Sequence, residues 1–332
     1  MSSVSIYACG GAGTNIIQNS LDLSKSLEMP EINLSIIDTS QSNVKVNLDK
    51  ENIGYTFVDG LNGGGKDQRL AFDHAQPYVN EHLNKNKPGD FNIVLFSLSG
   101  ASGSSTGSLI TNELLKRNLP VICFVVGSVE DGKQATNTFN SLRTLQNLSK
   151  KHGLPLTIAY HENDYTGQNT GRRGDEEYVN EAIFVGIRDL CRLVSEKHHG
   201  LDREDIRNWL YFGKVSDTIG LVELFTAEDH DDMKQAEGRV ITSASLLPTQ
   251  LSPVPSLMQP YSCKGYISDA LSKELGDEFT GFHYLITKGF IKGPYNRIKM
   301  KVSEYEEALA KLQSSDDDID DDFNEDDDPF KF

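Results

Sequence analysis

Short apolar runs of four to six residues alternate, along the first half of the chain, with longer segments that are apolar only at every third or fourth position. The runs are rich in β-branched and aromatic residues and therefore predict strands, at Val4–Cys9, Leu34–Ile37, Phe91–Phe96, Val121–Val126 and Leu156–Tyr160. The longer segments predict helices at 15–27, 67–84, 108–117 and 136–151. This alternation indicates a doubly wound α/β fold around a parallel sheet.

A longer amphipathic stretch follows at 175–197, and its apolar residues Val179, Ile183, Ile187, Leu190 and Val194 are spaced like one face of a helix. We expect a central helix that connects the first domain to a smaller α+β domain. Further helices are expected at 205–212, 267–275 and 304–312, and strands at 220–226 and 283–291. The predicted divisions are a first domain at 1–174, a central helix at 175–200, a C-terminal domain at 201–298, a helix at 299–313 and a tail at 314–332.

Charge is concentrated at the end of the chain. The 332 residues carry a formal net charge of −17, which disfavours nonspecific binding to nucleic acid or to an anionic membrane. Residues 314–332 contribute −9 of this total, from nine Asp, one Glu and one Lys. Such a segment cannot bury enough apolar surface to fold alone, so we expect a tail that is disordered when free from Ser315 onward.

The cysteines are scattered, at Cys9, Cys123, Cys191 and Cys263, and form no C-x-x-C pair. They indicate buried small hydrophobes in a reducing cytoplasm and no disulfide framework. His161-Glu162 and His198-His199 lack a third metal ligand and are expected at the surface. No apolar stretch approaches the roughly 20 residues that a membrane span needs, so we expect a cytosolic protein.

Two glycine-rich turns follow apolar strands and open the helices that come next. Free N–H groups and the helix dipole favour an anion at such a helix N-terminus, and glycine lets the backbone approach it. Two such turns suggest a polyphosphate held between them. The first contains Gly10, Gly11, Ala12, Gly13, Thr14 and Asn15, and the second contains Ser99, Gly100, Ala101, Ser102, Gly103, Ser104, Ser105, Thr106 and Gly107.

Two other nucleotide motifs match less well. A Rossmann dinucleotide fingerprint would use Gly11, Gly13 and the acid Asp38, but its third glycine is replaced by Ile16, and the second turn would have no role. The segment 60–67 nearly matches a P-loop, with Asp67 where Ser or Thr should meet magnesium. A third phosphate loop explains this segment better, and a flexible surface turn is the alternative.

The stretch 97–108 closely resembles the G-G-G-T-G-[ST]-G signature of the tubulin and FtsZ superfamily, and 10–15 resembles its G-G-x-G-x-N loop. Ser99, Ala101 and Ser105 depart from the commonest form, but small hydroxylated residues still donate to phosphate. Order and spacing agree over roughly the first two hundred residues. Beyond the two turns, the resemblance implies nucleotide binding by Asp38, Thr39, Gly63, Gly64, Gly65, Lys66, Asn137 and Asn140.

The same resemblance implies how guanine is selected. Asn163 matches the base-contacting asparagine of the superfamily, and a side-chain amide can both donate to and accept from a base edge. From the start of the central helix, Tyr178 would stack on the base and Asn180 would hydrogen-bond to it. Neither falls in perfect register with the superfamily, so solvent-exposed helix residues remain the alternative for both.

Asp202 and Asp205 lie just after the central helix, three residues apart, on one helical face. One interpretation is an N-cap with an acidic first turn. In tubulin-like proteins, acids at this place reach into the nucleotide pocket of the next subunit and orient the attacking water. The resemblance therefore implies a catalytic role for both carboxylates, with Mg²⁺ held mainly by the phosphates of GTP and not by dedicated protein ligands.

The motif Leu201–Asp205 and the acidic tail resemble those of the bacteriophage-encoded, PhuZ-like tubulins. That resemblance implies a cytoskeletal GTPase that polymerises head to tail in the host cytoplasm, cycles between GTP and GDP, and positions phage DNA or capsids. It implies self-association, with the tail docking on a basic surface of a neighbour, contacts with capsid or nucleus-shell proteins, and no direct binding to nucleic acid or membrane. The alternatives are a plasmid-partitioning tubulin, a polymer with a weak or lost GTPase, and a non-polymerising Rossmann-type enzyme.

Overall fold

The computed structural model describes residues 3–18, 23, 26–61, 65, 67–163, 172–195, 197–212, 216–227, 236–250, 252 and 259–320, with the backbone alone at 172–175 and 314–320. The strands are β1 (Ser3–Cys9), β2 (Glu31–Asp38), β3 (Gly54–Phe57), β4 (Phe91–Ser97), β5 (Val121–Gly127), β6 (Leu156–Glu162), β7 (Leu221–Ala227), β8 (Val240–Leu247), β9 (Tyr261–Tyr266) and β10 (Phe282–Thr287). The helices are α1 (Gly10–Gln18), the short η2 (Gln41–Asn43), α2 (Gln68–Lys85), α3 (Ala101–Lys116), α4 (Gly132–His152), α5 (Arg172–Val194), α6 (Arg203–Tyr211), α8 (Asp269–Leu275) and α9 (Lys292–Asp320).

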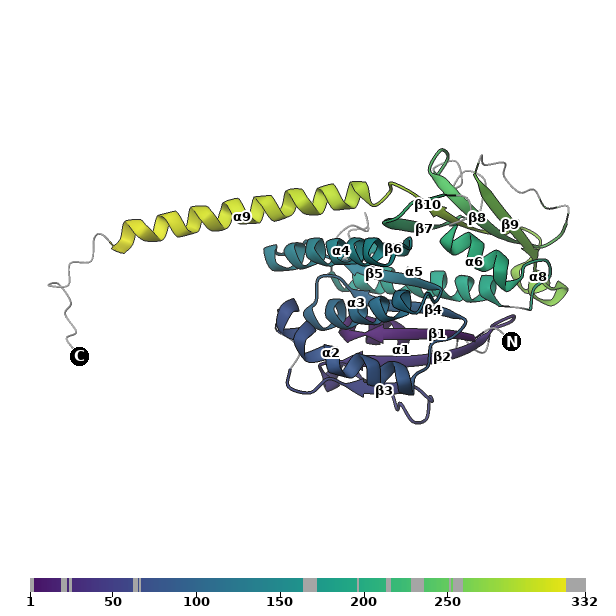
Figure 1. Cartoon of the computed structure of the whole chain (residues 1–332), viewed down its shortest axis with the longest axis horizontal. Coiled ribbons are helices and arrows are strands. Elements are labelled where there is room, and N and C mark those ends of the chain that lie inside the picture. The colour runs from purple at the N-terminus through teal and green to yellow at the C-terminus, as the bar shows by residue number, and fades with distance from the viewer. Residues whose placement is uncertain are drawn as a thin grey trace.

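All ten described strands form one sheet in the order β3-β2-β1-β4-β5-β6-β7-β10-β8-β9 (Figure 1). Strands β1 to β6 are parallel, which confirms the predicted doubly wound parallel sheet. Strand β7 pairs in parallel with β6, starting at Leu156 and Leu221, and β10 then runs antiparallel to both β7 and β8. The sheet therefore continues across the predicted division between the first and the C-terminal domains.

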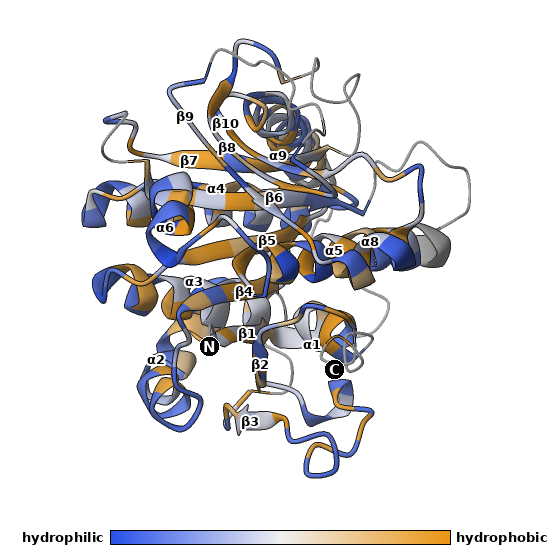
Figure 2. Ribbon diagram, turned by 90° about the vertical axis from the view of Figure 1, so that its right-hand side faces the viewer, coloured by the Kyte–Doolittle hydropathy of each residue, from blue (hydrophilic) through white to orange (hydrophobic). Residues whose placement is uncertain are grey.

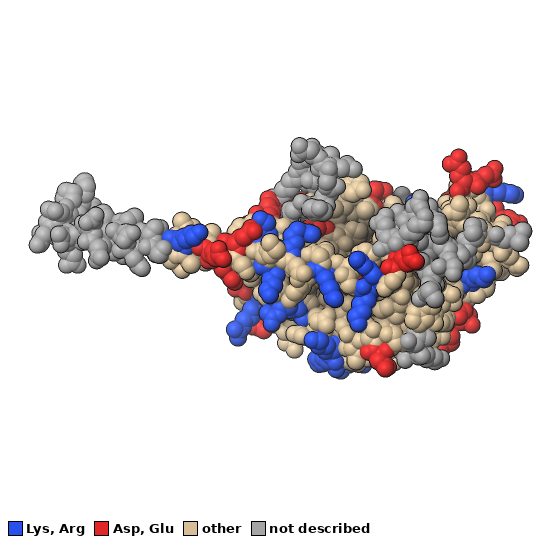
Figure 3. Space-filling model, turned by 90° about the horizontal axis from the view of Figure 1, so that it is seen from above, with Lys and Arg blue, Asp and Glu red and all other residues tan. Residues whose placement is uncertain are grey.

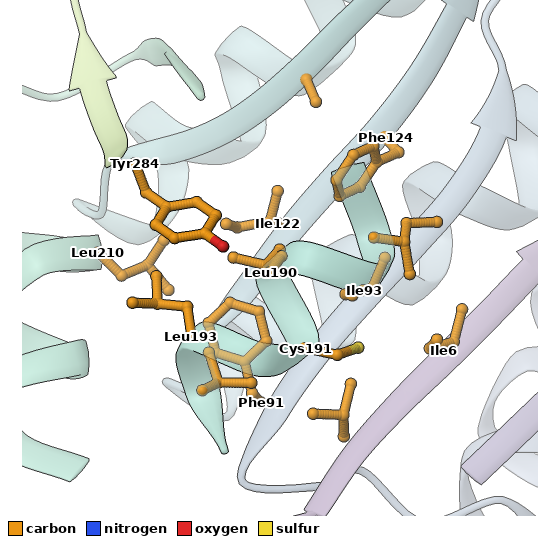
Figure 4. Close-up of a cluster of buried hydrophobic side chains, with 14 of the residues drawn as sticks. Ile6, Phe91, Ile93, Ile122, Phe124, Leu190, Cys191, Leu193, Leu210 and Tyr284 are labelled. Carbon is orange, nitrogen blue, oxygen red and sulfur yellow. The ribbon is translucent and has the colours of Figure 1, made fainter. Parts of the chain in front are cut away.

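The sheet is buried between two layers of helices. One face is covered by α2, α3 and α4, and the other by α1 and α5; Figure 2 shows the hydrophobic strands between helices with hydrophilic outer sides. The five residues predicted for the inner face of the central helix are all at most 7% exposed. Residues of α5 pack against strand residues such as Phe91 and Ile122 and against Tyr284 of β10 (Figure 4). The central helix thus joins both parts of the molecule into one core.

The structure differs from the predicted elements at several boundaries. Helices α1 and α3 begin at Gly10 and Ala101, so most of each glycine-rich segment is helical and not a loop. Strands β8 and β9 were not predicted. Strand β8 carries polar residues that are buried, among them Thr242, Ser243 and Ser245, which hides it from a hydrophobicity pattern. Strand β10 ends at Thr287, earlier than expected.

Helix α9 is much longer than the predicted 304–312. Its first half packs on α4 through Ile298, which is fully buried, and its second half extends away from the body (Figure 1). The Tyr305 hydroxyl donates to the carbonyls of Val129 and Glu130, both at 3.2 Å, and Arg297 pairs with Glu162 at the end of β6. The expected disorder from Ser315 is wrong for 315–320, which continue the helix, while 321–332 lie outside the described residues.

Candidate functional site

A cleft lies at the carboxyl ends of β1, β2 and β4, where the two predicted turns meet. In a doubly wound sheet this edge is the usual place for a ligand. Among the described residues that line the cleft there is no Lys or Arg; they are Gly11, Ala12, Asp38, Asn43, Ser97, Ser99, Gly100, Ala101, Ser102, Gly103 and Gln134. Because α1 and α3 both begin here, the polar groups that face the cleft include backbone N–H donors of two helix N-termini.

The glycines of the two turns serve first to bring backbone segments together. Gly10 has φ of +67°, and a Cβ on it would lie 2.5 Å from the amide nitrogen of Gly103. A Cβ on Gly13 would lie 2.4 Å from the carbonyl oxygen of Leu95, and one on Gly107 would lie 2.4 Å from the ring of Phe96. Gly107 therefore packs α3 on β4 and is not among the residues that line the cleft.

Asp38 is fully buried, and both of its oxygens accept hydrogen bonds. Oδ1 accepts from the backbone of Thr39 (2.7 Å) and of Ser40 (3.2 Å) and from the hydroxyl of Ser102 (3.0 Å), while Oδ2 accepts from the side chain of Asn43 (2.7 Å). The carboxylate thus ties the end of β2 to the first turn of α3. Beside it, the hydroxyl of Thr39 is buried without a partner in the described structure, which fits a site that a polar ligand completes.

Several hydroxyls of the second turn bond within the protein. Ser104 donates to the carbonyl of Gly100 (2.5 Å), Ser105 to that of Gln68 (2.9 Å) and Thr106 to that of Ser102 (2.7 Å). In the first turn, Thr14 donates in the same way to Gly10 (2.9 Å) and is buried, while Asn15 is exposed. These hydroxyls shape the cleft from behind.

Two predicted residues of α4 have different environments. Asn137 is buried, and its amide donates to the carbonyl of Ser99 at 3.0 Å, so it supports the cleft from behind. Asn140 is exposed and outside the cleft lining. Of the predicted loop at 63–66, Gly63, Gly64 and Lys66 lie outside the described residues, while Gly65 has φ of +53°.

The residues predicted to read the base lie one to two strands away from the cleft. Asn163 follows β6, and its backbone N–H donates to the carbonyl of Gly127 at 3.3 Å. Tyr178 is 53% exposed and lines a separate cavity with Tyr160 and Glu162 of β6. Asn180 is half-buried. The structure places Tyr178 beside β6, the strand that Asn163 follows, but the described cleft lining includes neither of them nor Asn180.

Asp202 and Asp205 lie at the opposite, amino-terminal edge of the sheet. Asp202 is the N-cap of α6, and the two residues form a reciprocal capping box: Oδ1 of Asp202 accepts from the N–H of Asp205 (2.9 Å), and Oδ2 of Asp205 accepts from the N–H of Asp202 (3.2 Å). The hydroxyl of Tyr261 also donates to Oδ1 of Asp205 (2.9 Å). Burial and this bond to Asp205 raise the pKa of Tyr261.

A cavity beside this capping box is lined by the segments that precede β4 and β5. Within it, Arg203 pairs with Asp90 at 3.1 Å, which fixes the start of α6 against the start of β4. His198 is buried, donates to the carbonyl of Leu193 (2.8 Å), and has a pKa that burial lowers. The expected surface position is therefore wrong for His198 and also for Glu162, which is 8% exposed. Glu162 pairs with Arg297, which is 135 residues away in the sequence, so this contact could not be read from the local pattern.

Sequence reasoning missed the residues that support the cleft from other elements. Asn43 and Gln134 line it, and Gln68 holds its rear wall. All three carry side-chain amides, which occur throughout the chain, so only the three-dimensional arrangement separates them from surface residues. Within the described residues, no group of three or more His, Cys, Asp or Glu side chains could hold a metal ion, and no helix is long and apolar enough to cross a membrane.

Comparisons with known proteins agree with this geometry. No protein-family profile matches the chain. The chain is 30% identical over 328 residues to a phage tubulin-like protein of Pseudomonas phage PhiPA3, covering 98% of this chain and 97% of the relative. It superimposes on a protofilament of TubZ from bacteriophage PhiKZ with a TM-score of 0.79 and 27% identity, covering 92% of both chains. It also superimposes on a GDP-bound structure of the phage tubulin PhuZ with a TM-score of 0.81 and 24% identity, covering 93% of this chain and 92% of that one.

The doubly wound sheet, the two glycine-rich helix starts and the central helix define a protein of the tubulin and FtsZ fold. The identity to the PhiPA3 protein extends over nearly the whole of both chains. The chain accordingly belongs to the phage tubulin-like proteins.

Proposed function

We propose that this chain is a cytoskeletal GTPase of a bacteriophage that polymerises head to tail and hydrolyses GTP between adjacent subunits. The observation that carries the proposal is the position of two features on one sheet. The cleft lies at the carboxyl edge, and Asp202 and Asp205 lie at the amino edge. Stacking of identical subunits along this direction would bring the acids of one subunit to the cleft of the next, so each active site needs two copies.

The cleft suits a guanine nucleotide. The N–H groups at the starts of α1 and α3 would bind phosphate oxygens, as at other helix N-termini, and the buried hydroxyl of Thr39 offers a further donor. Binding of GTP and GDP is supported by the GDP in the PhuZ structure, which shares the fold. Asn163 and Asn180 would hydrogen-bond to the base, and Tyr178 would stack on it. A Mg²⁺ ion bound by the phosphates would neutralise their charge during hydrolysis.

Hydrolysis would use the carboxylates of the neighbouring subunit. Asp202 is exposed, and a carboxylate near the γ-phosphate can orient a water molecule and draw a proton from it. In a single subunit the two acids bond mainly to each other's backbone. The GTPase should therefore be slow in the monomer and start on assembly. Loss of the γ-phosphate would then limit the lifetime of the filament.

Assembly is also supported by the charge distribution along α9. Its first half carries exposed or half-buried cations, and α4 beside it adds others, whereas Glu304, Glu306 and Glu307 follow further out. Figure 3 shows Lys and Arg gathered on the body beside α9. The basic surface is made by Lys133, Arg143, Lys150, Lys151, Lys292, Arg297, Lys299 and Lys301. The acidic tail of one subunit would dock on this surface of a neighbour, a contact that salt would weaken.

In the host cytoplasm, such filaments would position phage DNA or capsids, in contact with capsid or nucleus-shell proteins. The protofilament formed by the PhiKZ protein supports self-association. The cargo itself is proposed from the family alone.

The proposal is tested by light scattering and phosphate release after addition of GTP and Mg²⁺. The intact chain should polymerise above a threshold concentration and later disassemble. The double variant Asp202→Ala/Asp205→Ala should form lasting polymer and release little phosphate, and a chain truncated after Asp320 should form little polymer. Phosphate release that rises in proportion to protein concentration, without a threshold, would indicate a monomeric enzyme. If the intact chain shows neither light scattering nor phosphate release, the proposed GTPase is ruled out.

A matched variant separates chemistry from helix capping. Asp202→Asn preserves an N-cap of nearly equal strength but removes the carboxylate. It should fold as the wild type does and still form lasting polymer. If it hydrolyses GTP at the wild-type rate, Asp202 acts only as a cap.

A further inference from the structure

We propose that Gln68 is a positioning residue for the phosphate-facing end of α3, an inference that rests on the nucleotide binding proposed above. Gln68 is the first residue of α2, directly after the N-cap Asp67. It does not line the cleft. Its side chain instead reaches behind the cleft, into the angle between α3 and α4.

Four oxygens surround the amide nitrogen of Gln68. The hydroxyls of Ser104 and Ser141 both lie 2.9 Å from Nε2, the carbonyl of Leu98 lies at 3.1 Å, and the carbonyl of Asn137 lies at 3.3 Å. An amide nitrogen has two hydrogens to donate. The two shortest contacts therefore take them, and the nitrogen joins α3 to α4.

The direction of these bonds is fixed by the other partners of the two serines. Ser104 donates its hydroxyl hydrogen to the carbonyl of Gly100, and Ser141 donates its own to the carbonyl of Leu98 (2.8 Å). Each hydroxyl is thus left to accept from Gln68. A donor is required at this position, and a carboxylate of the same shape could not replace it without breaking one of those bonds.

The contact is reciprocal. The hydroxyl of Ser105 donates to the backbone carbonyl of Gln68 at 2.9 Å, and Ser105 occupies a position where the superfamily signature has Gly or Thr. Gln68, Ser104, Ser105 and Ser141 thus form a clamp, which holds the segment 98–105 from both of its ends.

The clamped segment contains Ser99 and Gly100 to Gly103, which line the cleft. Their backbone N–H groups can bind phosphate well only when they point to one place, because small displacements of a binding group weaken it strongly. Gln68 touches no ligand, and it acts by fixing those groups. Its effect should therefore depend on the number of phosphates in the ligand.

The test compares the full-length wild type with Gln68→Ala, Gln68→Glu and Gln76→Ala. Competition fluorescence, at protein concentrations below the polymerisation threshold, measures the affinity of each for GMP, GDP and GTPγS. Gln76 is the matched control, since it is an exposed glutamine of the same helix. Thermal unfolding without nucleotide is measured in parallel. We expect both Gln68 variants to lose about tenfold in affinity for GDP and GTPγS while GMP changes little, and Gln76→Ala to match the wild type.

Two results would overturn the inference while leaving the proposed function intact. One is an affinity for GDP that is unchanged in both Gln68 variants, even if they unfold at lower temperature. The other is an equal loss for GMP, GDP and GTPγS, which would indicate general damage to the site. A wild type that binds none of the three nucleotides would instead overturn the proposed function, and this inference with it.

Discussion

The two edges of the parallel sheet both carry carboxylates, but in opposite environments. At the carboxyl edge, Asp38 is fully buried and accepts hydrogen bonds from four donors. At the amino edge, Asp202 is exposed, and each acid of the capping box bonds to the backbone of the other. The carboxylate of Asp38 accepts hydrogen bonds from groups around the cleft and so stabilises its shape. The backbone N–H groups of the cleft remain available to a ligand. The acids of the amino edge remain at the surface, where another subunit can meet them.

The difference shows that residue type alone does not separate structural from chemical roles. Both edges contain an aspartate next to a helix start. Asp38 is buried and accepts from four donors, so its carboxylate helps to hold the cleft together, whereas Asp202 is exposed and accessible to a partner.

The largest effect should come from the carboxyl edge itself. Gly13→Ala would place a Cβ 2.4 Å from the carbonyl oxygen of Leu95, so α1 must move away from the sheet. We expect a loss of about 4 kcal/mol in the free energy of unfolding, measured by chemical denaturation. Gly293→Ala is the control, because nothing lies within 4 Å of its added Cβ. A loss below about 1 kcal/mol for Gly13→Ala would contradict the close packing of α1 on the sheet.

Asp38→Ala should be the next most damaging change. It leaves the buried donors of Thr39 and Ser102 and the half-buried donor of Asn43 without their acceptor, and we expect a loss of about 3 kcal/mol in the free energy of unfolding. Denaturant titration against the wild type measures it. A loss no larger than that of Asp202→Ala would mean that the contrast between the two edges is wrong.

Asp202→Ala removes a helix cap and should lower the free energy of unfolding by about 1 kcal/mol. Asp202→Asn should leave it nearly unchanged, because asparagine caps a helix as well as aspartate does. The same titration provides both values. Equal losses in the two variants would show that the carboxylate charge, and not the cap, stabilises α6.

The smallest effect should be a dependence of stability on pH at the amino edge. Burial lowers the pKa of His198 below its ordinary value, so the folded protein binds a proton less readily than the unfolded chain. The contribution of His198 is complete above the unfolded pKa of about 6.5 and is lost as the pH falls below it. Unfolding titrations between pH 8 and pH 5 should show a shallower decline for His198→Gln than for the wild type. If the free energy of unfolding falls with pH equally steeply in both proteins, His198 is excluded as the source of this pH dependence.

The periodicity of the sequence was sufficient for the elements that bury one clear face. All five strands predicted for the first domain exist in β1, β2, β4, β5 and β6, and the five apolar residues predicted for the inner face of α5 are all buried. Strands with buried polar residues, such as β8, were missed because their pattern does not alternate. Helix α9 was predicted too short, because contacts with α4 and β6 fix its first half.

The sequence predicted which types of residue form the site, but not which of them line the cleft and which support it from behind. The glycine-rich segments were correctly placed at one edge of the sheet, since the carboxyl ends of parallel strands share that edge. That Gly107 packs against Phe96, and that Ser104 and Ser105 bond to Gln68, could not be read from spacing. The two serines lie 36 and 37 positions from Gln68 in the sequence, and small hydroxylated residues and glutamines are common on protein surfaces as well.

The sequence by itself determined the parallel sheet, the central helix, the two glycine-rich helix starts and the resemblance to tubulins, because each of these depends on local pattern and order. Only the tertiary structure decided that one continuous sheet joins the two predicted domains and that Asp38 accepts hydrogen bonds from four donors. It also decided that Asp202 and Asp205 lie at the opposite edge of the sheet from the cleft of their own chain. The physical reason is that burial, donor count and direction are properties of the packed sheet, which brings distant residues together, and no short segment contains them.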